Sequence, residues 1–313
     1  MEVRRLVKSG VSSLVVAIPK DWIDHNKLSQ GDQIFIEAFG DDLVIRKVLK
    51  QKPINKDEKV IDVDEKNERM LSREIIAAYM NNYYYIIFKG KKLKDKSKYI
   101  KQMISGLIAL EVIDETSEKI VTKSFLNIYD SDINLLLRRM DNTVRSMMQD
   151  TKEAIKNPDL VDNIVDRDRE VNKMNYLIAK ILKAAFRDNS LVKVIGLNDK
   201  EMLRYWEINE LLEKIGDRTK HIARLVPDIK PANRKKFLEL FSDIEQFYFD
   251  SMKAFYTMSE KYADAVVDQK SVLGEKIGQF NTPNCLVCSK IAVNAFNING
   301  LINDIGRVVK YLE

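Results

Sequence analysis

The chain is poor in the residue types that build metal centres of cysteine and histidine. Its 313 residues include only two cysteines, Cys285 and Cys288, and two histidines, His25 and His221. A single C-x-x-C without a second pair is a weak zinc or redox signal, so we expect two small apolar residues at the start of a helix. No Gly-rich phosphate loop, nucleophile elbow or H-E-x-x-H pattern occurs, so nothing indicates an enzyme and no catalytic residue is assigned.

Long apolar segments are also missing. No hydrophobic run approaches the roughly 18 residues of a membrane span, and the opening residues MEVRRLVKSG lack the apolar stretch of a signal peptide. We therefore predict a cytoplasmic protein without membrane insertion. Lysine and arginine number 52 against 47 acidic residues, so the net charge of +5 is slight and any basic surface must be local. The length suggests two to three domains.

Residues 1–50 have the pattern of a small β-rich domain. Turn signals at Ser9-Gly10 and at Gly40-Asp41 separate the expected strands, and Pro19 begins a short helix. The expected strands are residues 3–8, 13–18, 33–38 and 43–46. Fifty residues of this kind bury too little apolar surface to fold alone, so we predict that a second copy completes the core as a homodimer.

Three motifs in this segment, Lys8-Ser9-Gly10, Ala17-Ile18-Pro19-Lys20 and the run from Leu28 to Ile34, resemble the AbrB/SpoVT/MazE swapped-hairpin family. The resemblance implies two interlaced chains that present basic residues to DNA. The candidate DNA contacts are Arg4, Arg5 and Lys8, with Arg46 and Lys47 as weaker additions. Because the segment carries eight basic and seven acidic residues, a dimerisation-only module or one that grips a protein partner stays an alternative.

Residues 51–128 alternate between strand and helix patterns, which predicts a small α/β domain after a polar linker at 51–58. Expected strands cover 59–63 and 83–88 and two short stretches near Glu111 and Ile120, and expected helices cover 67–79 and 96–109. Seven lysines lie between Lys89 and Lys101. Such a run is most often a solvated loop and helix start, with contact to nucleic acid as the alternative.

Residues 129–313 show apolar residues at three- and four-residue spacing, which predicts an all-α domain. The expected helices are 131–157, 160–188, 198–226, 232–262, 264–280 and 285–312. They form two sets of three, about 129–227 and 231–313, because the segment beginning at Leu211 aligns with the segment beginning at Leu301. Lys220 then matches Lys310. We therefore predict two three-helix bundles.

Glu213 and Asp217 lie four residues apart on one helical face, where like charges are destabilising unless a cation sits between them. Asp168 belongs to the apolar stripe of another helix, and a buried carboxylate needs a partner. Asp168, Glu213 and Asp217 could together hold iron, zinc, magnesium or manganese through oxygen ligands. In the alternative, Lys214 and its basic neighbours neutralise the pair on a solvated surface.

The segment Leu211-Leu212-Glu213-Lys214-Ile215-Gly216-Asp217 resembles the signature of the PhoU family of phosphate-uptake regulators. That family is all-helical, repeats a three-helix unit and places acidic metal-binding pairs on these two helices. This sequence departs from it at Asn172, where a carboxylate is expected, and at Asn303 and Arg307, which align with Glu213 and Asp217. The resemblance therefore implies metal in the first bundle only.

The whole chain resembles a phosphate uptake regulator of the archaeal type, in which an AbrB/SpoVT-like domain is fused to a PhoU-like domain. It is expected to be multidomain, with domains at 1–50, 51–128 and 129–313. The resemblance implies a cytoplasmic, dimeric, phosphate-responsive transcriptional regulator that binds DNA. The alternative is an adaptor that docks on a phosphate transporter or a signalling kinase without binding DNA.

Overall fold

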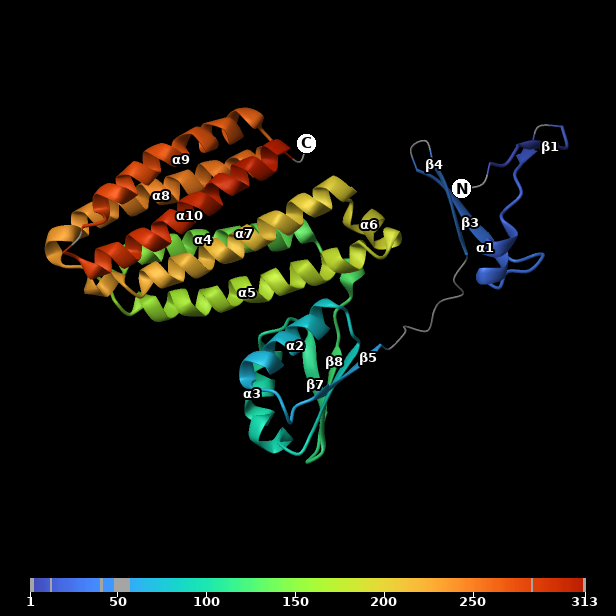
Figure 1. The fold of residues 1–313 in the computed structure, drawn as a ribbon, viewed down its shortest axis with the longest axis horizontal. Coiled ribbons are helices and arrows are strands. Elements are labelled where there is room, and N and C mark those ends of the chain that lie inside the picture. Colours follow the sequence, from blue (N-terminus) through green and yellow to red (C-terminus); the bar gives the residue numbers. More distant parts are fainter. Residues whose placement is uncertain (1–2, 12, 40–41, 48–56, 283, 312–313) are drawn as a thin grey trace. The chain divides into compact units, whose positions relative to one another are not determined.

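The structure is a computed structural model. It describes residues 3–11, 13–39, 42–47, 57–282 and 284–311. The chain divides into two units, Met1–Lys56 and Asp57–Glu313. The broad prediction is confirmed: a small β-rich N-terminal region is followed by a sheet-containing middle region and a helical C-terminal region (Figure 1). The three domain boundaries given above stay a prediction.

The described residues of the N-terminal unit form two antiparallel strand pairs and one short helix. Strand β1 (Val7–Ser9) pairs with β2 (Ser13–Val15), and β3 (Ile34–Phe39) pairs with β4 (Asp42–Lys47). Helix α1 (Lys20–His25) lies between the two pairs in the sequence. The first strand is shorter than predicted, because it begins at Val7 and not at residue 3. The predicted turn at Gly40-Asp41 lies outside the described residues.

Large apolar side chains of this unit are exposed in the single chain. Leu14 is 63% exposed, Phe35 61%, Ile36 57% and Leu43 59%. Each such side chain gains about 1.5–3 kcal/mol when it is removed from water. A unit with this much uncovered apolar surface is consistent with the predicted homodimer, in which a second copy covers the strands.

We expect the full chain to sediment as a dimer whose dissociation constant rises about a hundredfold or more when Leu14→Asp and Phe35→Asp are combined. Each protomer would then place two carboxylates where apolar side chains meet. Sedimentation equilibrium measures the change. Leu135→Asp is the matched control, since Leu135 is equally exposed, at 65%, but lies in the helical region. A dimer that tolerates the double change would contradict the assignment.

The second unit begins with a four-stranded sheet. Its strands are β5 (Glu58–Asp62), β6 (Tyr85–Lys89), β7 (Leu110–Glu115) and β8 (Lys119–Ser124), in the order β5-β6-β8-β7. Strands β5 and β6 are parallel, and the other pairs are antiparallel. The parallel pair needs a crossover, and helix α2 (Glu68–Met80) supplies it. This alternation is what the sequence predicts for the middle region.

Helices α2 and α3 (Leu93–Ser105) cover one face of the sheet (Figure 1). Their apolar stripes, which include Leu71, Ile75 and Ile100, are fully buried against strand residues such as Ile86 and Phe88. Asn67 begins α2 because its side chain accepts a hydrogen bond from the backbone N–H of Met70. The middle region therefore has its own hydrophobic core, separate from that of the helices that follow.

The helical region starts with the 3-10 turn η1 (Ile128–Asp130), and its described residues, 128–282 and 284–311, include six long helices. These are α4 (Ile133–Glu153), α5 (Leu160–Ala185), α7 (Asp199–Ala223), α8 (Pro231–Thr257), α9 (Glu260–Phe280) and α10 (Leu286–Tyr311). The helix starts follow capping chemistry: Asn198 and Glu201 form a capping box at α7, and Pro231 is the first residue of α8. A short helix that the sequence analysis did not predict, α6 (Asn189–Ile195), precedes α7.

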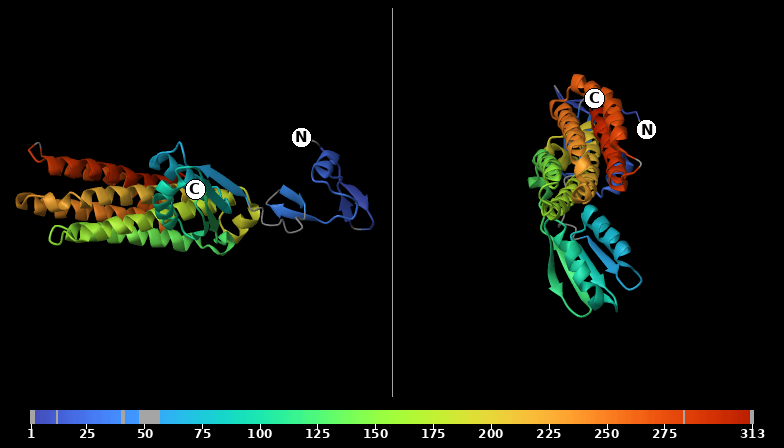
Figure 2. Two further views of the ribbon diagram at one scale, coloured as in Figure 1. Left: turned by 90° about the horizontal axis from the view of Figure 1, so that it is seen from below. Right: turned by 90° about the vertical axis from the view of Figure 1, so that its left-hand side faces the viewer.

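The long helices pack in two groups that run side by side (Figures 1 and 2). Helices α4, α5 and α7 contact one another, helices α8, α9 and α10 contact one another, and α7 contacts α10 between the groups. Gly306 of α10 allows close approach to α9, since a Cβ there would lie 3.0 Å from Val266 Cγ1 and 3.3 Å from the backbone oxygen of Ala263. One continuous core serves both groups.

A buried lysine joins the helical region to the middle region. Lys180 of α5 is 2% exposed, and its Nζ donates to the backbone oxygen of Tyr79 at 3.2 Å and to Ser124 Oγ at 3.4 Å. The same ammonium lies 4.2 Å from the centroid of the Tyr79 ring. In return, Asn82 Nδ2 donates to the backbone oxygen of Lys180 at 3.1 Å. Burial lowers the pKa of Lys180 to about 8.

We expect the free energy of unfolding of the wild type to rise, relative to that of Lys180→Met, between pH 8 and pH 10.5. The pKa of Lys180 is lowered in the folded chain, so the neutral side chain favours the folded state. The stability that Lys180 contributes is fully present above the pKa of the unfolded chain and is lost as the pH falls through about 8. The relative change should be on the order of 3 kcal/mol. Denaturant unfolding at several pH values measures it, and a constant difference over this range would contradict the burial effect.

Candidate functional site

The predicted DNA contacts of the N-terminal unit lie on and just before β1. Arg4, Arg5 and Lys8 are all exposed. Lys8 is the Cα partner of Leu14, so its side chain shares a face of the strand pair with an exposed apolar residue. The three cations are thus exposed on one short segment, and their contact with DNA stays a prediction.

The two weaker candidates lie on β4. Lys47 Nζ donates to the backbone oxygen of Asn26, so this ammonium already binds within the unit. The side chain of Arg46 lies outside the described part of the structure; its backbone pairs with Phe35 across the β3–β4 ladder. The DNA-contact prediction for these two residues stays a prediction.

The lysine run of the middle region has a partly structural role. Lys96 Nζ donates to the backbone oxygens of Val63 and Lys66, and so holds the turn between β5 and α2. Lys101 forms an ion pair with Glu115 at 3.0 Å. Two lysines of the run therefore stabilise the α/β fold.

The three predicted metal ligands lie on α5 and α7, and the structure places a lysine between two of them. Lys220 Nζ lies 2.7 Å from Asp168 Oδ2 and 2.7 Å from Asp217 Oδ1. Asp168 is 5% exposed and also accepts a hydrogen bond from Asn172 Nδ2 at 3.4 Å. Asp217 Oδ2 lies 3.3 Å from His221 Nε2. An ammonium group thus provides the cation that two of these carboxylates require.

The pKa values of this acidic cluster (Asp168, Glu213 and Asp217) diverge. Burial raises the pKa of Glu213, and the charges of Asp217, Glu210 and Asp168 raise it further. Burial also opposes ionisation of Asp217, but the hydrogen bond and charge of Lys220 outweigh it and lower the pKa of this carboxyl. The pKa of Lys220 is raised in turn, since its bonds to the two aspartates outweigh its burial. The surroundings therefore disfavour ionisation of Glu213 and favour ionisation of Asp217.

The donor set is only partly suited to a metal. Three carboxylates offer oxygen atoms to a hard or borderline cation. Among the described residues, however, no three histidine, cysteine, aspartate or glutamate side chains converge closely enough to hold one. A metal at Asp168 and Asp217 would have to displace Lys220 from its 2.7 Å contacts. The metal assignment stays a prediction with that requirement.

The second group of helices repeats this ion pair without the cluster. Lys310 of α10, which aligns with Lys220, pairs with Asp264 of α9. Asn303 is buried, whereas Arg307 is exposed and lies 3.6 Å from Asp304 on its own helix. The residues that align with Glu213 and Asp217 are thus an amide and a cation, and neither is an anionic ligand.

A buried carboxylate that the sequence analysis did not single out lies between the two groups. Asp141 of α4 is 3% exposed and accepts hydrogen bonds from Tyr248 Oη at 2.7 Å, Arg145 Nε at 2.9 Å and Tyr256 Oη at 3.1 Å. Burial and the charge of Asp141 raise the pKa values of both tyrosines, so they remain hydrogen-bond donors. The sequence signal that could have identified Asp141 was its position four residues after Leu137, on the same helical face, which the structure buries.

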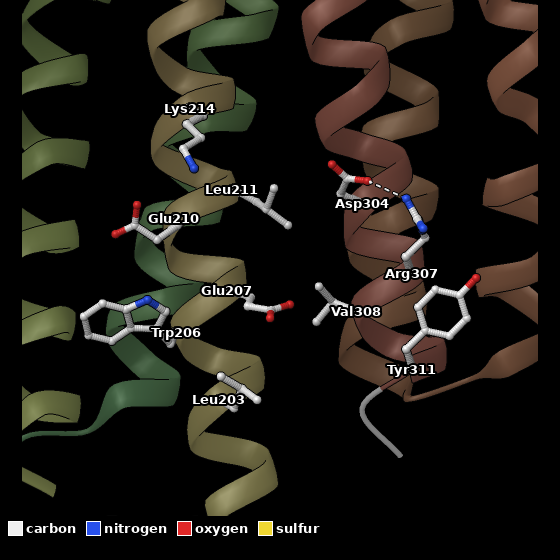
Figure 3. A pocket seen from close by; sticks show the side chains of 10 residues that line it. All are labelled: Leu203, Trp206, Glu207, Glu210, Leu211, Lys214, Asp304, Arg307, Val308 and Tyr311. Atoms are coloured by element: carbon white, nitrogen blue, oxygen red, sulfur yellow. Dashed lines mark ion pairs between the residues drawn. The ribbon is translucent and has the colours of Figure 1, made fainter. Parts of the chain in front are cut away.

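The seam between α7 and α10 carries a groove at each end. One has a volume of about 600 Å³, and Figure 3 shows Glu207, Glu210 and Asp304 at its walls, together with Trp206 and Tyr311. We call it the acidic groove. The other has a volume of about 480 Å³, and its basic lining consists of Arg218, His221, Arg224 and Lys290. We call it the basic groove. Sequence periodicity did not reveal the basic groove because its cations come from two helices.

The cysteines are not simply small apolar residues. Cys285 and Cys288 form a disulfide at the start of α10, with their Cα atoms 5.2 Å apart. Two residues between the cysteines bring them within bonding range where the first turn of the helix forms. Asn233 Nδ2 lies 3.3 Å from Cys288 Sγ and 3.6 Å from Cys285 Sγ. The disulfide differs from our expectation for these residues.

Comparison with protein families agrees with this architecture at both ends of the chain. The family model of the PhoU domain matches residues 137–226. The family model described as antidote-toxin recognition MazE, bacterial antitoxin, matches residues 7–54. The two matches together confirm the resemblance to a fusion of a MazE/AbrB-type domain with a PhoU domain. The PhoU match covers α4 to α7 and ends before α8, so the acidic cluster lies within it.

Comparisons with curated proteins and with solved structures each found no match. Among the described residues, no helix has both the length and the low polarity that crossing a membrane requires.

We expect Glu213→Gln to raise the free energy of unfolding at pH 7 by a few tenths of a kcal/mol, the cost of a like-charge pair at this spacing. The pKa of Glu213 is raised in the folded chain, so the protonated side chain favours the folded state. The stability that Glu213 contributes is fully present below the unfolded pKa and is lost as the pH rises through the folded pKa. The gain should therefore vanish near pH 4. Glu207→Gln on the same helix is the control, because its acidic neighbour Glu210 is balanced by Arg204 three residues earlier, and Leu211 lies four residues later.

The same variants test for metal. If manganese, zinc, magnesium or iron binds the cluster, the metal should raise the melting temperature of the wild type and of Glu207→Gln but not that of Glu213→Gln. A metal-induced rise of equal size in all three proteins would place the metal elsewhere.

Proposed function

We propose that the protein is a phosphate-responsive transcriptional regulator of the cytoplasm. Its MazE-type domain forms a homodimer that binds DNA, and its PhoU domain senses an effector or docks on a partner. The observation that carries the proposal is the presence of both domains in one chain, with Arg4, Arg5 and Lys8 exposed beside β1. A dimeric DNA reader tethered to a helical body can respond when a ligand changes the spacing of its two halves.

The charges of the described residues support a division of roles. The N-terminal cations supply contacts to phosphate that carry no sequence information by themselves, so they position the reader on DNA. The acidic cluster and the two grooves belong to the helical region. A metal held by Asp168, Glu213 and Asp217 is part of the proposal, and it would supply charge neutralisation to the cluster in place of Lys220. Catalysis has no part in it.

We expect the combined change Arg4→Ala, Arg5→Ala and Lys8→Ala to abolish a gel shift on a pool of genomic fragments while leaving the dimer intact. Three cations on each of two protomers should lower the salt dependence, d(log K)/d(log[salt]), by roughly 5 if all contact phosphates. Binding is measured at several salt concentrations, with and without inorganic phosphate and divalent metal.

Lys20→Ala with Lys27→Ala is the matched control, because both residues are exposed lysines of the same unit outside β1. It should keep the shift. An unchanged shift in the triple variant would refute the residue assignment. A wild type that binds no fragment would favour the adaptor, in which the MazE-type domain only dimerises and the PhoU domain docks on a transporter or kinase.

A further inference from the structure

The basic groove gathers cations that have no carboxylate partner. Arg218 and Arg224 come from the C-terminal end of α7 and the residue after it, and Lys290 comes from the first part of α10. Within the part of the chain that the structure describes, none of the three forms an ion pair with an aspartate or glutamate, and no acidic residue lines the groove. Like charges held together in this way repel one another unless an anion joins them.

The acidic side chain that acts on Arg218 is already engaged by other basic groups. Asp217 acts on Arg218 through its charge, but Lys220 binds one of its oxygens at 2.7 Å and His221 lies 3.3 Å from the other. Basic residues at the C-terminal end of a helix are ordinarily explained by the helix dipole. That account covers Arg224, the residue after α7, but not Arg218, which lies before the last turn of α7. It does not cover Lys290 either, which belongs to the N-terminal half of a different helix.

The shape of the groove suits a small ligand. Its volume of about 480 Å³ falls within the range of small-molecule sites and exceeds what a single tetrahedral anion fills. Leu225 and Val293 form an apolar floor beside the cations. Two guanidinium groups offer paired N–H donors, the geometry that matches phosphoryl oxygens, and the ammonium adds a point charge.

We propose that the basic groove between α7 and α10 binds a multivalent oxyanion of the phosphate class, with Arg218, Arg224 and Lys290 as its ligands. This inference deepens the proposed function and rests on it for its regulatory meaning, because it gives the helical region an effector of defined chemistry. The ligand is inorganic phosphate or a short phosphoanhydride chain, and the volume favours the chain.

Isothermal titration calorimetry of the full chain tests the site with inorganic phosphate, pyrophosphate and tripolyphosphate at constant ionic strength. We expect one anion per chain, with tighter binding of the two longer anions. Arg218→Gln, Arg224→Gln and Lys290→Gln should each weaken binding about tenfold, the loss of one charge-assisted contact. Tighter binding of inorganic phosphate than of the longer anions would support the site but assign it to the single ion.

Lys214→Gln is the matched control, because Lys214 is an exposed cation of the same helix that lines the acidic groove. It should bind as the wild type does. Thermal unfolding verifies that each variant is folded, and Lys290→Gln keeps the test valid if an arginine change prevents folding, since Lys290 is exposed. No heat of binding with any of the three anions, or equal affinity in wild type and groove variants, would overturn the proposal.

Gel shifts without added anion separate this proposal from the proposed function. Groove variants that lose the anion but keep DNA binding would support both. A wild type that binds the anion and no DNA would leave the groove standing and remove the transcriptional role. A wild type that binds DNA and no anion would overturn the groove proposal and leave the transcriptional role standing.

Discussion

The buried carboxylate of Asp141 is the constraint that the packing of α4 against α8 must satisfy. An ionised carboxylate away from water is costly unless its oxygens are filled, and here two tyrosine hydroxyls and one guanidinium fill them. The tyrosines lie on α8 and Arg145 lies on α4, so the network joins the first group of helices to the second. Arg145 also lies 4.5 Å from the centroid of the Phe249 ring, which removes its cation further from water. With α4 fixed against α8, α7 and α10 form the other contact between the groups, and both grooves lie along it.

Lys220 and Lys310 occupy aligned positions in the two groups of helices but stabilise them by different amounts. Lys220 binds a buried aspartate and a second aspartate on its own helix, whereas Lys310 pairs with Asp264 where both side chains are about half exposed. An exposed pair of that kind contributes little, because water screens it and two mobile side chains must be held. Each group therefore has an ion pair between its second and third long helices, but the buried pair with shifted pKa values lies in the first group. The extent of the PhoU match agrees with this division, since it covers the first group.

Sequence reasoning predicted elements well where periodicity is strong and contacts poorly where they join distant segments. Apolar spacing located the six long helices, and Asn67 and Pro231 lie at helix starts as capping chemistry requires. It missed α6, whose seven residues are too few to show a helical period. In the candidate site, the four-residue spacing of Glu213 and Asp217 and the stripe position of Asp168 were visible. That Lys220 would reach both aspartates was not, because the contact to Asp168 crosses 52 residues.

The acidic cluster and the basic groove meet at the Asp217–His221 contact. His221 lines the groove and lies 3.3 Å from Asp217, which the cluster shares with Lys220. Opposite charges drawn to sites one helical turn apart attract each other, so a cation at the cluster and an anion in the groove would each raise the affinity for the other. Linkage makes the two effects equal in free energy. Lys220 directly precedes His221, which lines the basic groove. If a metal displaced Lys220 from the two aspartates, the freed ammonium would therefore belong to a residue adjacent in sequence to the groove lining. Among the described residues, the groove cations Arg218, Arg224 and Lys290 form no ion pair, while burial and acidic neighbours raise the pKa of Glu213. An anion in the groove would relieve only the first of these two charge imbalances.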